Sequence, residues 1–289
     1  MKKLSENGIA LLVASSAFFT AMSLLARFTM RGLPPSEVTF FRMLIGVLVC
    51  AGLFAARVEP LDLRRPGVLL TRGVLGGIAV FLYFRTIGAL SAGEATLLNN
   101  TYVVFIAILS PFVLREKVTA GLALVVAVAL CWIALVIRAD AAGSVTGKLV
   151  GLAAAFFSAL AIMTIRNLRK DHGSATIFFF FSLGGLACSF ATLCDGWRVP
   201  DPSSAALLVA MGLSAAGGQL LFTQALKYTR ALESSTFSQI TVVFTYAGEV
   251  ALWGLEVTAV SMAGAALIIG ACIYLGAVLK DASEAPPAG

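Results

Sequence analysis

Residues 82–119 read LYFRTIGALSAGEATLLNNTYVVFIAILSPFVLREKVT, and a related stretch stands 139 residues further along the chain. Residues 221–258 read LFTQALKYTRALESSTFSQITVVFTYAGEVALWGLEVT, align with it without a gap and are identical to it at eight of 38 positions. Each copy contains an apolar run close to the roughly 20 residues that a helix needs to cross a bilayer. The two copies predict a chain built from two related halves, each with membrane-spanning helices.

Ten apolar stretches of this kind fill nearly all of the 289 residues and leave no room for a soluble domain. Charged residues make up only 12% of the sequence, whereas soluble proteins carry about 25%. In lipid the backbone has to satisfy its own hydrogen bonds, so each stretch is expected to be a helix. We predict an all-α integral membrane protein with ten transmembrane helices, at residues 8–27, 37–55, 67–88, 93–114, 119–138, 147–166, 174–193, 203–226, 233–253 and 257–279.

Five spans in each half is an odd number, which turns the second half upside down relative to the first. The basic residues agree, because Arg115 and Lys117 follow the fourth stretch of the first half, while Lys227 and Arg230 precede the fourth stretch of the second. Two inverted halves that rock about a site near the middle of the membrane are a device of secondary transporters. We expect two inverted five-helix repeats and a cytoplasmic tail, at residues 1–140, 145–280 and 281–289.

Lysine and arginine are unevenly distributed over the loops. With the N-terminus in the cytoplasm, 14 of the 21 basic residues, Arg72 among them, fall in cytoplasmic segments, six fall on the far side and Arg42 lies within a span. The positive-inside rule favours this orientation, and we expect a protein of the cell inner (plasma) membrane with both termini in the cytoplasm. The net charge of +6 does not indicate nucleic acid as a partner, because no basic run is interleaved with aromatic residues.

Several short motifs stand at characteristic places: Pro34-Pro35, Phe41-Arg42, Phe84 to Ala95, Ser110-Pro111 and Leu114 to Thr119. With these motifs the chain resembles the drug/metabolite transporter superfamily, in its ten-helix EamA-type branch, over essentially its whole length. The second half departs from the pattern, because it lacks the proline and shortens the Glu-x-x-Thr motif to Glu256-Val257-Thr258.

The resemblance implies a secondary transporter that exports amino acids or similar small metabolites by alternating access. Two alternatives stay open. One is a carrier of nucleotides or nucleotide conjugates from the same superfamily, which would need several basic residues in its cavity. The other is a membrane subunit that transports nothing.

Enzyme chemistry finds no support in the sequence. The chain has no GxxxxGK[ST] motif for ATP, and its one histidine, His172, is expected to be a solvated loop residue. The five cysteines include no CxxC pair and are interpreted as small packing residues, so no metal and no cofactor are expected. The expected partners are a small-molecule substrate and the lipid bilayer, with a proton as coupling ion and a second copy of the chain left open.

Charged side chains within a span are costly unless they are paired or hydrated, which makes them functional candidates. Arg42 either fixes its helix through an ion pair or clamps a substrate carboxylate. Arg85 either snorkels to the headgroups or lies on a common cavity face with its repeat counterpart Gln224. Glu249 is expected to pair with Arg42 or Arg85, or else to contact substrate or carry a proton.

Uncharged polar side chains form a second set of candidates. Asn99 and Asn100 correspond to Ser238 and Gln239 in the second copy, and such groups either bond between helices or line a substrate site near the midplane. Buried tyrosine hydroxyls also seek partners. We expect the site between the first, third, fourth, sixth, eighth and ninth stretches. The candidate residues are Arg42, Tyr83, Arg85, Asn99, Asn100, Tyr102, Gln224, Gln239, Tyr246 and Glu249.

Two local features predict packing and capping. Gly73 with Gly77 and the pair Gly184-Gly185 let helices approach closely. Glu94 and Glu233 stand at helix starts, where a negative side chain is favoured by the helix dipole, and we expect both to act as caps.

Overall fold

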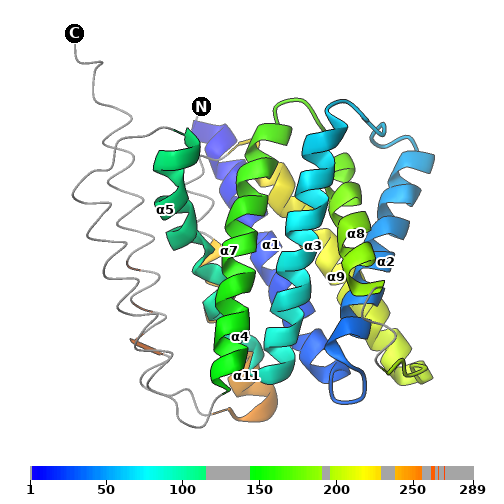
Figure 1. Ribbon diagram of the computed structural model, residues 1–289, viewed down its shortest axis with the longest axis vertical. Coiled ribbons are helices and arrows are strands. Elements are labelled where there is room, and N and C mark those ends of the chain that lie inside the picture. The colour runs from blue at the N-terminus through cyan, green and yellow to red at the C-terminus, as the bar shows by residue number, and fades with distance from the viewer. Residues whose placement is uncertain are drawn as a thin grey trace.

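The computed structural model describes residues 2–114, 144–190, 196–228 and 238–255, together with positions 262, 263, 266 and 270. Within these ranges the regular structure consists of helices, which confirms the all-α class for the described residues (Figure 1). The helices are α1 (Lys2–Thr29), α2 (Pro35–Ala55), α3 (Pro66–Ala89), α4 (Ala92–Asn100), α5 (Tyr102–Leu114), α7 (Val145–Leu168), α8 (Ser174–Phe190), α9 (Pro202–Ala225) and α11 (Ile240–Trp253). The spans expected at 119–138 and 257–279, the start of the span at 233–253 and the cap Glu233 lie outside the described residues.

Five of the described helices are long and apolar enough to cross a membrane: α1 from Gly8, α2, α3, α7 as far as Ile165, and α9. The helices α8 and α11 are shorter apolar helices of 17 and 14 residues. Three of the long helices begin with a proline, Pro35, Pro66 or Pro202. Proline suits this position because the first helical N–H has no partner within the helix and the fixed φ of proline is already helical.

The fourth expected span, 93–114, is not one continuous helix. It divides at Thr101 into α4 and α5. Both the backbone N–H and the hydroxyl of Thr101 donate to the Leu98 carbonyl, at 3.1 and 2.6 Å, three residues back. This tighter turn replaces the ordinary i to i−4 hydrogen bond, and back-bonding of this kind by threonine bends helices.

Helices from the two halves interleave in the bundle. The helix α1 packs along α9, α3 lies between α7 and α8, and α2 contacts α8 and α9 (Figure 1). The helix α11 contacts α1 and α4. In Figure 1 α1 runs downward from the N-terminus, while α7, the first helix of the second half, runs upward. The interior is therefore built jointly by both halves.

Glycines set the contact between α3 and α8. A Cβ on Gly77 would lie 2.6 Å from the Gly185 nitrogen and 2.7 Å from the Gly184 carbonyl carbon. A Cβ on Gly73 would lie 2.5 Å from the Phe180 carbonyl oxygen. The prediction that these glycines let helices approach closely is confirmed, and the structure shows that the two glycine pairs face each other.

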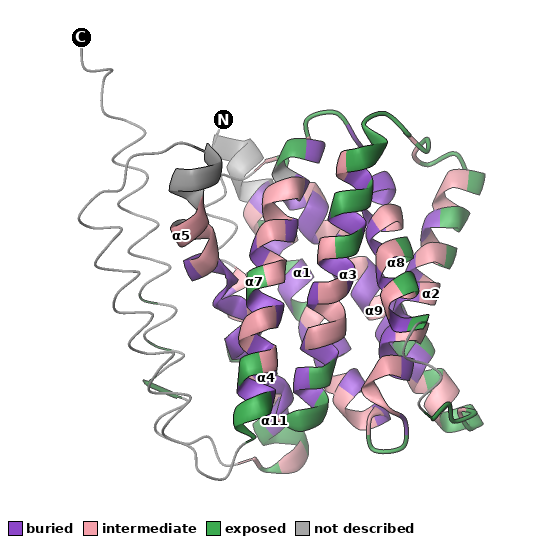
Figure 2. Cartoon of the chain, viewed as in Figure 1, coloured by how far each residue is buried: buried purple, intermediate pink, exposed green. Residues whose placement is uncertain are grey.

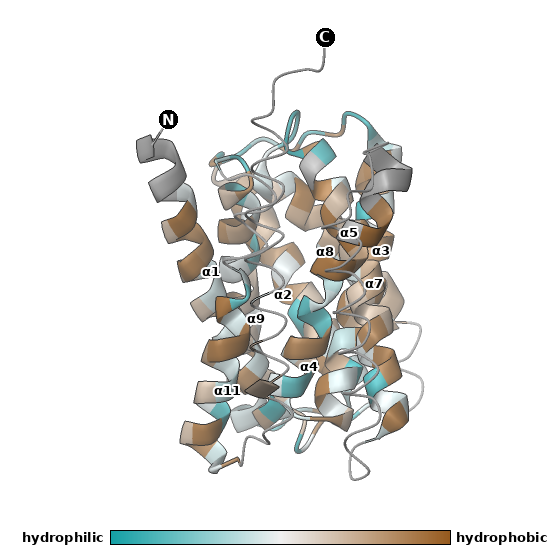
Figure 3. Ribbon diagram, turned by 90° about the vertical axis from the view of Figure 1, so that its left-hand side faces the viewer, coloured by the Kyte–Doolittle hydropathy of each residue, from teal (hydrophilic) through white to brown (hydrophobic). Residues whose placement is uncertain are grey.

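Burial follows the contacts between helices. Buried residues lie on the faces that helices turn toward one another, and exposed residues lie on the outer faces and at the ends (Figure 2). Apolar residues cover long parts of the helices, while polar residues gather at the loops and at a few places between helices (Figure 3). Large apolar side chains such as Leu48, Leu70 and Leu213 are more than half exposed. Such outward-facing residues suit contact with lipid tails.

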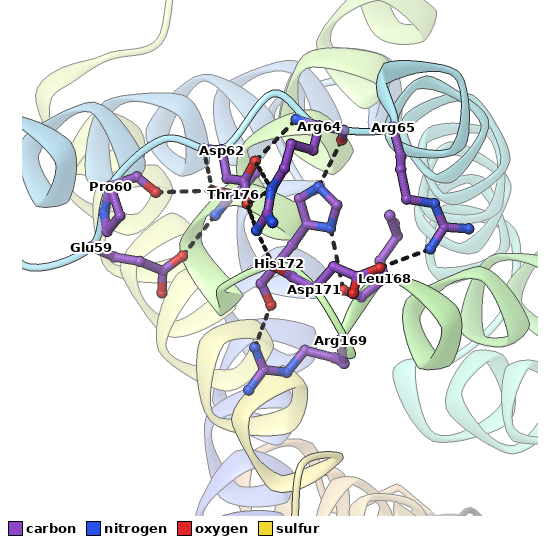
Figure 4. A network of polar contacts seen from close by, with 10 residues as sticks. All are labelled: Glu59, Pro60, Asp62, Arg64, Arg65, Leu168, Arg169, Asp171, His172 and Thr176. Carbon is purple, nitrogen blue, oxygen red and sulfur yellow. Dashed lines mark hydrogen bonds and ion pairs between the residues drawn. The ribbon is translucent and has the colours of Figure 1, made fainter.

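The end of the bundle that carries the N-terminus is closed by a polar network between two loops (Figure 4). Asp62 accepts a bidentate pair of hydrogen bonds from Arg64, one on each carboxylate oxygen, and Arg65 forms an ion pair with Asp171 at 2.9 Å. The Glu59 carboxylate accepts the backbone N–H of Ala175 at 3.0 Å, at the start of α8. The hydrogen bonds from Arg64 hold the pKa of the Asp62 carboxyl well below its usual range.

His172 lies inside this network, and the expectation of a solvated loop histidine is wrong. Its side chain is 3% exposed. One ring nitrogen lies 2.7 Å from the Arg64 carbonyl oxygen and the other lies 3.3 Å from the Leu168 carbonyl oxygen. The imidazole is buried because it ties the loop before α3 to the end of α7 (Figure 4).

The start of α4 carries a complete capping box. The Ser91 hydroxyl accepts the N–H of Glu94 at 3.0 Å, and the Glu94 carboxylate accepts the N–H of Ser91 at 3.1 Å. The expected role of Glu94 as a cap is confirmed. The box satisfies two backbone N–H groups that the helix itself cannot pair.

We expect Ser91→Ala to lower the free energy of unfolding by about 1 kcal/mol, because the Glu94 N–H loses its acceptor. The measurement is denaturant unfolding of the purified protein in detergent. Ser91→Thr keeps a hydroxyl and serves as the control. An alanine variant as stable as the threonine variant would contradict this role of the hydroxyl.

Candidate functional site

A cavity lies inside the bundle, between helices of both halves. The volume of this cavity is about 150 Å³. Its wall is formed by α1 to α4 from the first half and by α7 to α9 from the second, together with Tyr102, Ser238 and Thr241. Because both halves contribute, a relative movement of the halves would reshape this space.

The wall is polar where the helices meet. The Tyr83 hydroxyl lies 2.8 Å from the hydroxyls of both Ser23 and Thr96, which links α3 to α1 and α4. Asn100 donates its amide to the Thr96 carbonyl at 2.9 Å. Every one of these groups borders the cavity. A small polar ligand would therefore meet hydroxyls and amides that can both donate and accept.

Hydrogen bonds across the wall join the two halves. The Ser158 hydroxyl of α7 donates to the Asn99 side chain of α4 at 3.0 Å. The hydroxyls of Tyr102 and Ser238 lie 2.7 Å apart. These contacts would have to break or be exchanged if the halves moved apart, so they belong to the present conformation of the cavity.

Two buried arginines also border the cavity. Arg42 on α2 is 4% exposed and Arg72 on α3 is 3% exposed. Both guanidinium groups lie over the ring of Phe181, with their central carbons 5.4 and 4.3 Å from its centroid. Burying a charge costs several kcal/mol, whereas each cation–π contact returns about 0.5–2 kcal/mol. The aromatic ring therefore offsets part of the cost.

A sequence match to a known protein family agrees with this geometry. The model of the EamA-like transporter family matches residues 6–138 and again residues 145–277. The chain belongs to the EamA-like transporter family. The protein is therefore a membrane-embedded, multi-pass transporter and not an enzyme, as its family and its relatives show.

Its relatives cover nearly its whole length. The pseudopaline exporter CntI of Pseudomonas aeruginosa is 28% identical over 281 residues, which are 96% of this chain and 98% of that protein. An uncharacterized transporter of Helicobacter pylori is 24% identical over 289 residues, which are 95% of this chain and 96% of that one. Human solute carrier family 35 member G1 is 28% identical over 228 residues, or 73% of this chain and 62% of that protein.

A protein of known crystal structure has the same fold. It superimposes with a TM-score of 0.69 at 22% sequence identity, and the match covers 96% of this chain and 99% of the other. At this level of identity the similarity shows the fold and gives no information about the substrate.

Half of the candidate residues border the cavity of this EamA-like transporter. They are Arg42, Tyr83, Asn99, Asn100 and Tyr102. The other five, Arg85, Gln224, Gln239, Tyr246 and Glu249, lie outside its wall. The cavity therefore separates the candidates into five that line it and five that do not.

The expectation that Arg85 and Gln224 share a cavity face is wrong. Arg85 is exposed on the outside of α3, with its guanidinium over the Phe81 ring at 5.6 Å. Gln224 instead accepts hydrogen bonds from Ser174 at 3.1 Å and Arg169 at 3.3 Å. The repeat register matched their positions along the helices, but it did not fix the rotation of α3 and α9 about their own axes.

Glu249 pairs with neither Arg42 nor Arg85. Its carboxylate accepts a hydrogen bond from Arg27 at 2.7 Å and the backbone N–H groups of Ala92 at 2.8 Å and Gly93 at 2.7 Å. It therefore sits at the start of α4, where the helix dipole and unpaired N–H groups favour a negative charge. The absence of a side chain on Gly93 gives the carboxylate room, because a Cβ there would lie 2.6 Å from it.

The remaining two candidates are buried near the same helices. Gln239, just before α11, is 1% exposed, and Tyr246 on α11 is 8% exposed. The Tyr246 ring lies against Gly93, where a Cβ would come within 2.7 Å of it. Packing of α11 on α4 accounts for its position.

Sequence reasoning missed Arg72. The count of basic residues places it in a cytoplasmic segment, although it stands within the apolar stretch 67–88. The structure places it one turn and a half inside α3, buried at the cavity. Its depth in that stretch was the signal, because a cation this far inside a span is a functional candidate by the reasoning that singled out Arg42.

Metal ligands do not gather in the described part of the chain. The described ranges contain no group of three or more histidine, cysteine, aspartate or glutamate side chains that could hold an ion. Cys50 and Cys188 are free thiols, the first buried and the second half-buried. The remaining three cysteines, Cys131, Cys194 and Cys272, lie outside the described residues.

Proposed function

We propose that this chain is a secondary transporter that exports amino acids or similar small metabolites across the inner (plasma) membrane by alternating access. The observation that carries the proposal is the cavity shared by both halves, whose largely apolar wall carries hydroxyl, amide and guanidinium groups. Its hydroxyl and amide groups suit a small polar or zwitterionic cargo. The relative that exports pseudopaline supports export of a small metabolite.

The proposed architecture has ten transmembrane helices in two inverted five-helix repeats, residues 1–140 and 145–280, and a tail at 281–289. The repeated family match supports two units of similar length. The opposite directions of α1 and α7 in Figure 1 support the inversion. An inverted pair offers two related conformations, one open to each side, which is the basis of alternating access.

The charge at one end supports a cytoplasmic location for the N-terminus, and an even number of spans would bring the C-terminus to the same side. The loops 56–65 and 169–173 lie at the end of the bundle where the N-terminus lies (Figure 1). They carry five of the basic residues, namely Arg57, Arg64, Arg65, Arg169 and Lys170. By the positive-inside rule this end faces the cytoplasm.

The present conformation is proposed to have its far side shut. Glu249 joins α11 to α4 and to α1 through Arg27. The helices α4 and α11 lie at the end of the bundle opposite the N-terminus (Figure 1). The wall residues on α7, from Ser158 to Ile165, lie in the half of that helix nearer the cytoplasmic end. Export would require the far-side contacts to open while the polar loop network stays closed.

Counterflow in proteoliposomes tests the function. We expect the purified protein, loaded with one amino acid, to take up a labelled amino acid that shares its site. A panel of nucleotides is tested in parallel. Exchange of nucleotides without exchange of amino acids would support the alternative, a nucleotide carrier. Repeating the assay across a pH gradient shows whether a proton is coupled. A protein that exchanges neither class would contradict the proposal.

We expect Asn99→Ala and Asn100→Ala each to raise the KM for the exchanged cargo by up to about tenfold, the effect of losing one hydrogen bond of about 1.4 kcal/mol. Both side chains border the cavity. Arg85→Ala is the matched control, because Arg85 is exposed outside the wall. Unchanged kinetics in both asparagine variants would remove these residues from the site.

A further inference from the structure

We propose that Arg42 and Arg72 form one site for paired carboxylates, so that the preferred cargo is a small metabolite with two carboxylate groups. The inference deepens the proposed function and rests on it. It starts from the position of the two side chains on neighbouring helices, α2 and α3, at the same cavity.

Neither arginine has a carboxylate partner among the described residues. The ion pairs described there are Arg27 with Glu249, Arg64 with Asp62, and Arg65 with Asp171. Arg42 donates to the sulfur atoms of Met22 at 3.3 Å and Met43 at 3.6 Å. Thioether sulfur is a weak acceptor and carries no charge, so it does not replace a counter-ion.

Arg72 is less satisfied still. Its Nε and one terminal nitrogen are buried without a hydrogen-bond partner in the described part of the structure. The guanidinium lies against Gly76, and a Cβ at that position would collide with it. Gly76 therefore leaves room for the Arg72 guanidinium, which has no counter-ion among the described residues. Native proteins bury an arginine in this way when a ligand or another partner supplies the acceptors.

None of the carboxylates on nearby helices forms an ion pair with Arg42 or Arg72. Glu249 is held by Arg27 and two backbone N–H groups, and Glu94 belongs to the capping box of α4. Glu37 on α2 accepts the backbone N–H of Arg198 at 3.1 Å with one oxygen, while its other oxygen is buried without a hydrogen-bond partner among the described residues. None of these three borders the cavity. The missing negative charge is thus expected to come from the cavity itself.

Two unpaired guanidinium groups select among cargos by charge. A zwitterion with one carboxylate brings no net charge and leaves the pair uncompensated. A metabolite with two carboxylates can place one on each arginine, and the planar fork of each guanidinium matches a carboxylate with two parallel hydrogen bonds. The polar groups around Tyr83 and Asn100 remain for an ammonium or hydroxyl group of the same ligand.

Binding to the purified full-length chain in detergent tests the site, with glutamate, glutarate, glutamine and inorganic phosphate as probes. We expect glutamate and glutarate to bind at least tenfold more tightly than glutamine, which has the same length and one carboxylate fewer. Arg42→Gln and Arg72→Gln are expected to abolish that preference, while Arg85→Gln, which lies outside the wall, keeps it. Equal affinity for glutamate and glutamine would overturn the proposal, and so would binding of phosphate in place of the carboxylates.

Thermal unfolding without ligand separates this role from a structural one. Removing an unpaired buried charge is expected to leave the melting temperature of Arg72→Gln equal to or above that of the parent. A lower melting temperature with unchanged selectivity would show an arginine that is paired within the protein, and would overturn the inference. If counterflow exchanges glutamine and glutamate equally, the result supports the proposed transport function and contradicts the paired-carboxylate site. If nothing is exchanged, the proposed function fails, and detergent binding still decides the site.

Discussion

Glu249→Ala is expected to lower the free energy of unfolding by about 3–5 kcal/mol, the cost of removing one partner from a buried ion pair. The carboxylate is fully buried, while the Arg27 side chain is 25% exposed. Its loss leaves Arg27 without a counter-ion and the N–H groups of Ala92 and Gly93 without acceptors. All of these defects fall at one point, where α1, α4 and α11 meet.

The isosteric variant Glu249→Gln should lose nearly as much. Both carboxylate oxygens accept hydrogen bonds, one from Ala92 and Arg27 and the other from Gly93. Glutamine keeps one acceptor and turns an N–H toward the second position, where it meets another donor. Shape is thus conserved while charge and one acceptor are lost, which separates the electrostatic effect from packing.

Denaturant unfolding in detergent measures both variants against Ser91→Ala. The serine belongs to the same helix start and carries no charge, so it reports the value of capping without an ion pair. If Glu249→Ala lowers the free energy of unfolding no more than Ser91→Ala does, Glu249 contributes only as a helix cap. A far larger loss supports its role in holding the three helices together.

Several features were readable from the sequence because they depend on local chemistry. Apolar runs and the cap Glu94 each act through neighbouring residues. The break at Thr101 depends on a single hydroxyl that donates to the carbonyl three residues back. Threonine is common within membrane helices, so its presence did not predict a break.

The partners of charged residues could not be predicted in the same way. Glu249 had Arg42 and Arg85 as candidate partners by depth in the membrane, and the structure pairs it with Arg27. Depth follows from position along a span, whereas pairing depends on how each helix is rotated. In a soluble helix the apolar stripe reveals that rotation, but in lipid the outer face is as apolar as the inner one. The same ambiguity put Arg85 in the cavity. Arg72 was missed for another reason, because the count of basic residues places it in a cytoplasmic segment although it lies within the apolar stretch 67–88.

The contact between α3 and α8 gives the second large effect. Gly77→Ala is expected to lower the free energy of unfolding by about 2–3 kcal/mol, within the range for overpacking of a close-packed interior. The added methyl would lie 2.6 Å from the Gly185 nitrogen and 2.8 Å from its Cα. These are backbone atoms of α8, so relief requires the two helices to separate. Alanine is the better helix former by about 1 kcal/mol, so the steric cost has to exceed that gain.

Gly52→Ala is the matched control, because Gly52 lies within α2 and a Cβ there meets nothing within 4 Å. It should stabilise the protein slightly, by about 0.5–1 kcal/mol. Denaturant unfolding and the KM for cargo are measured on both variants. Gly77→Ala should also weaken transport, since α3 carries Arg72 and Tyr83 to the cavity wall. A Gly77 variant that is as stable as the Gly52 variant would mean that the helices tolerate a wider spacing, and that the glycine contact does not position α3.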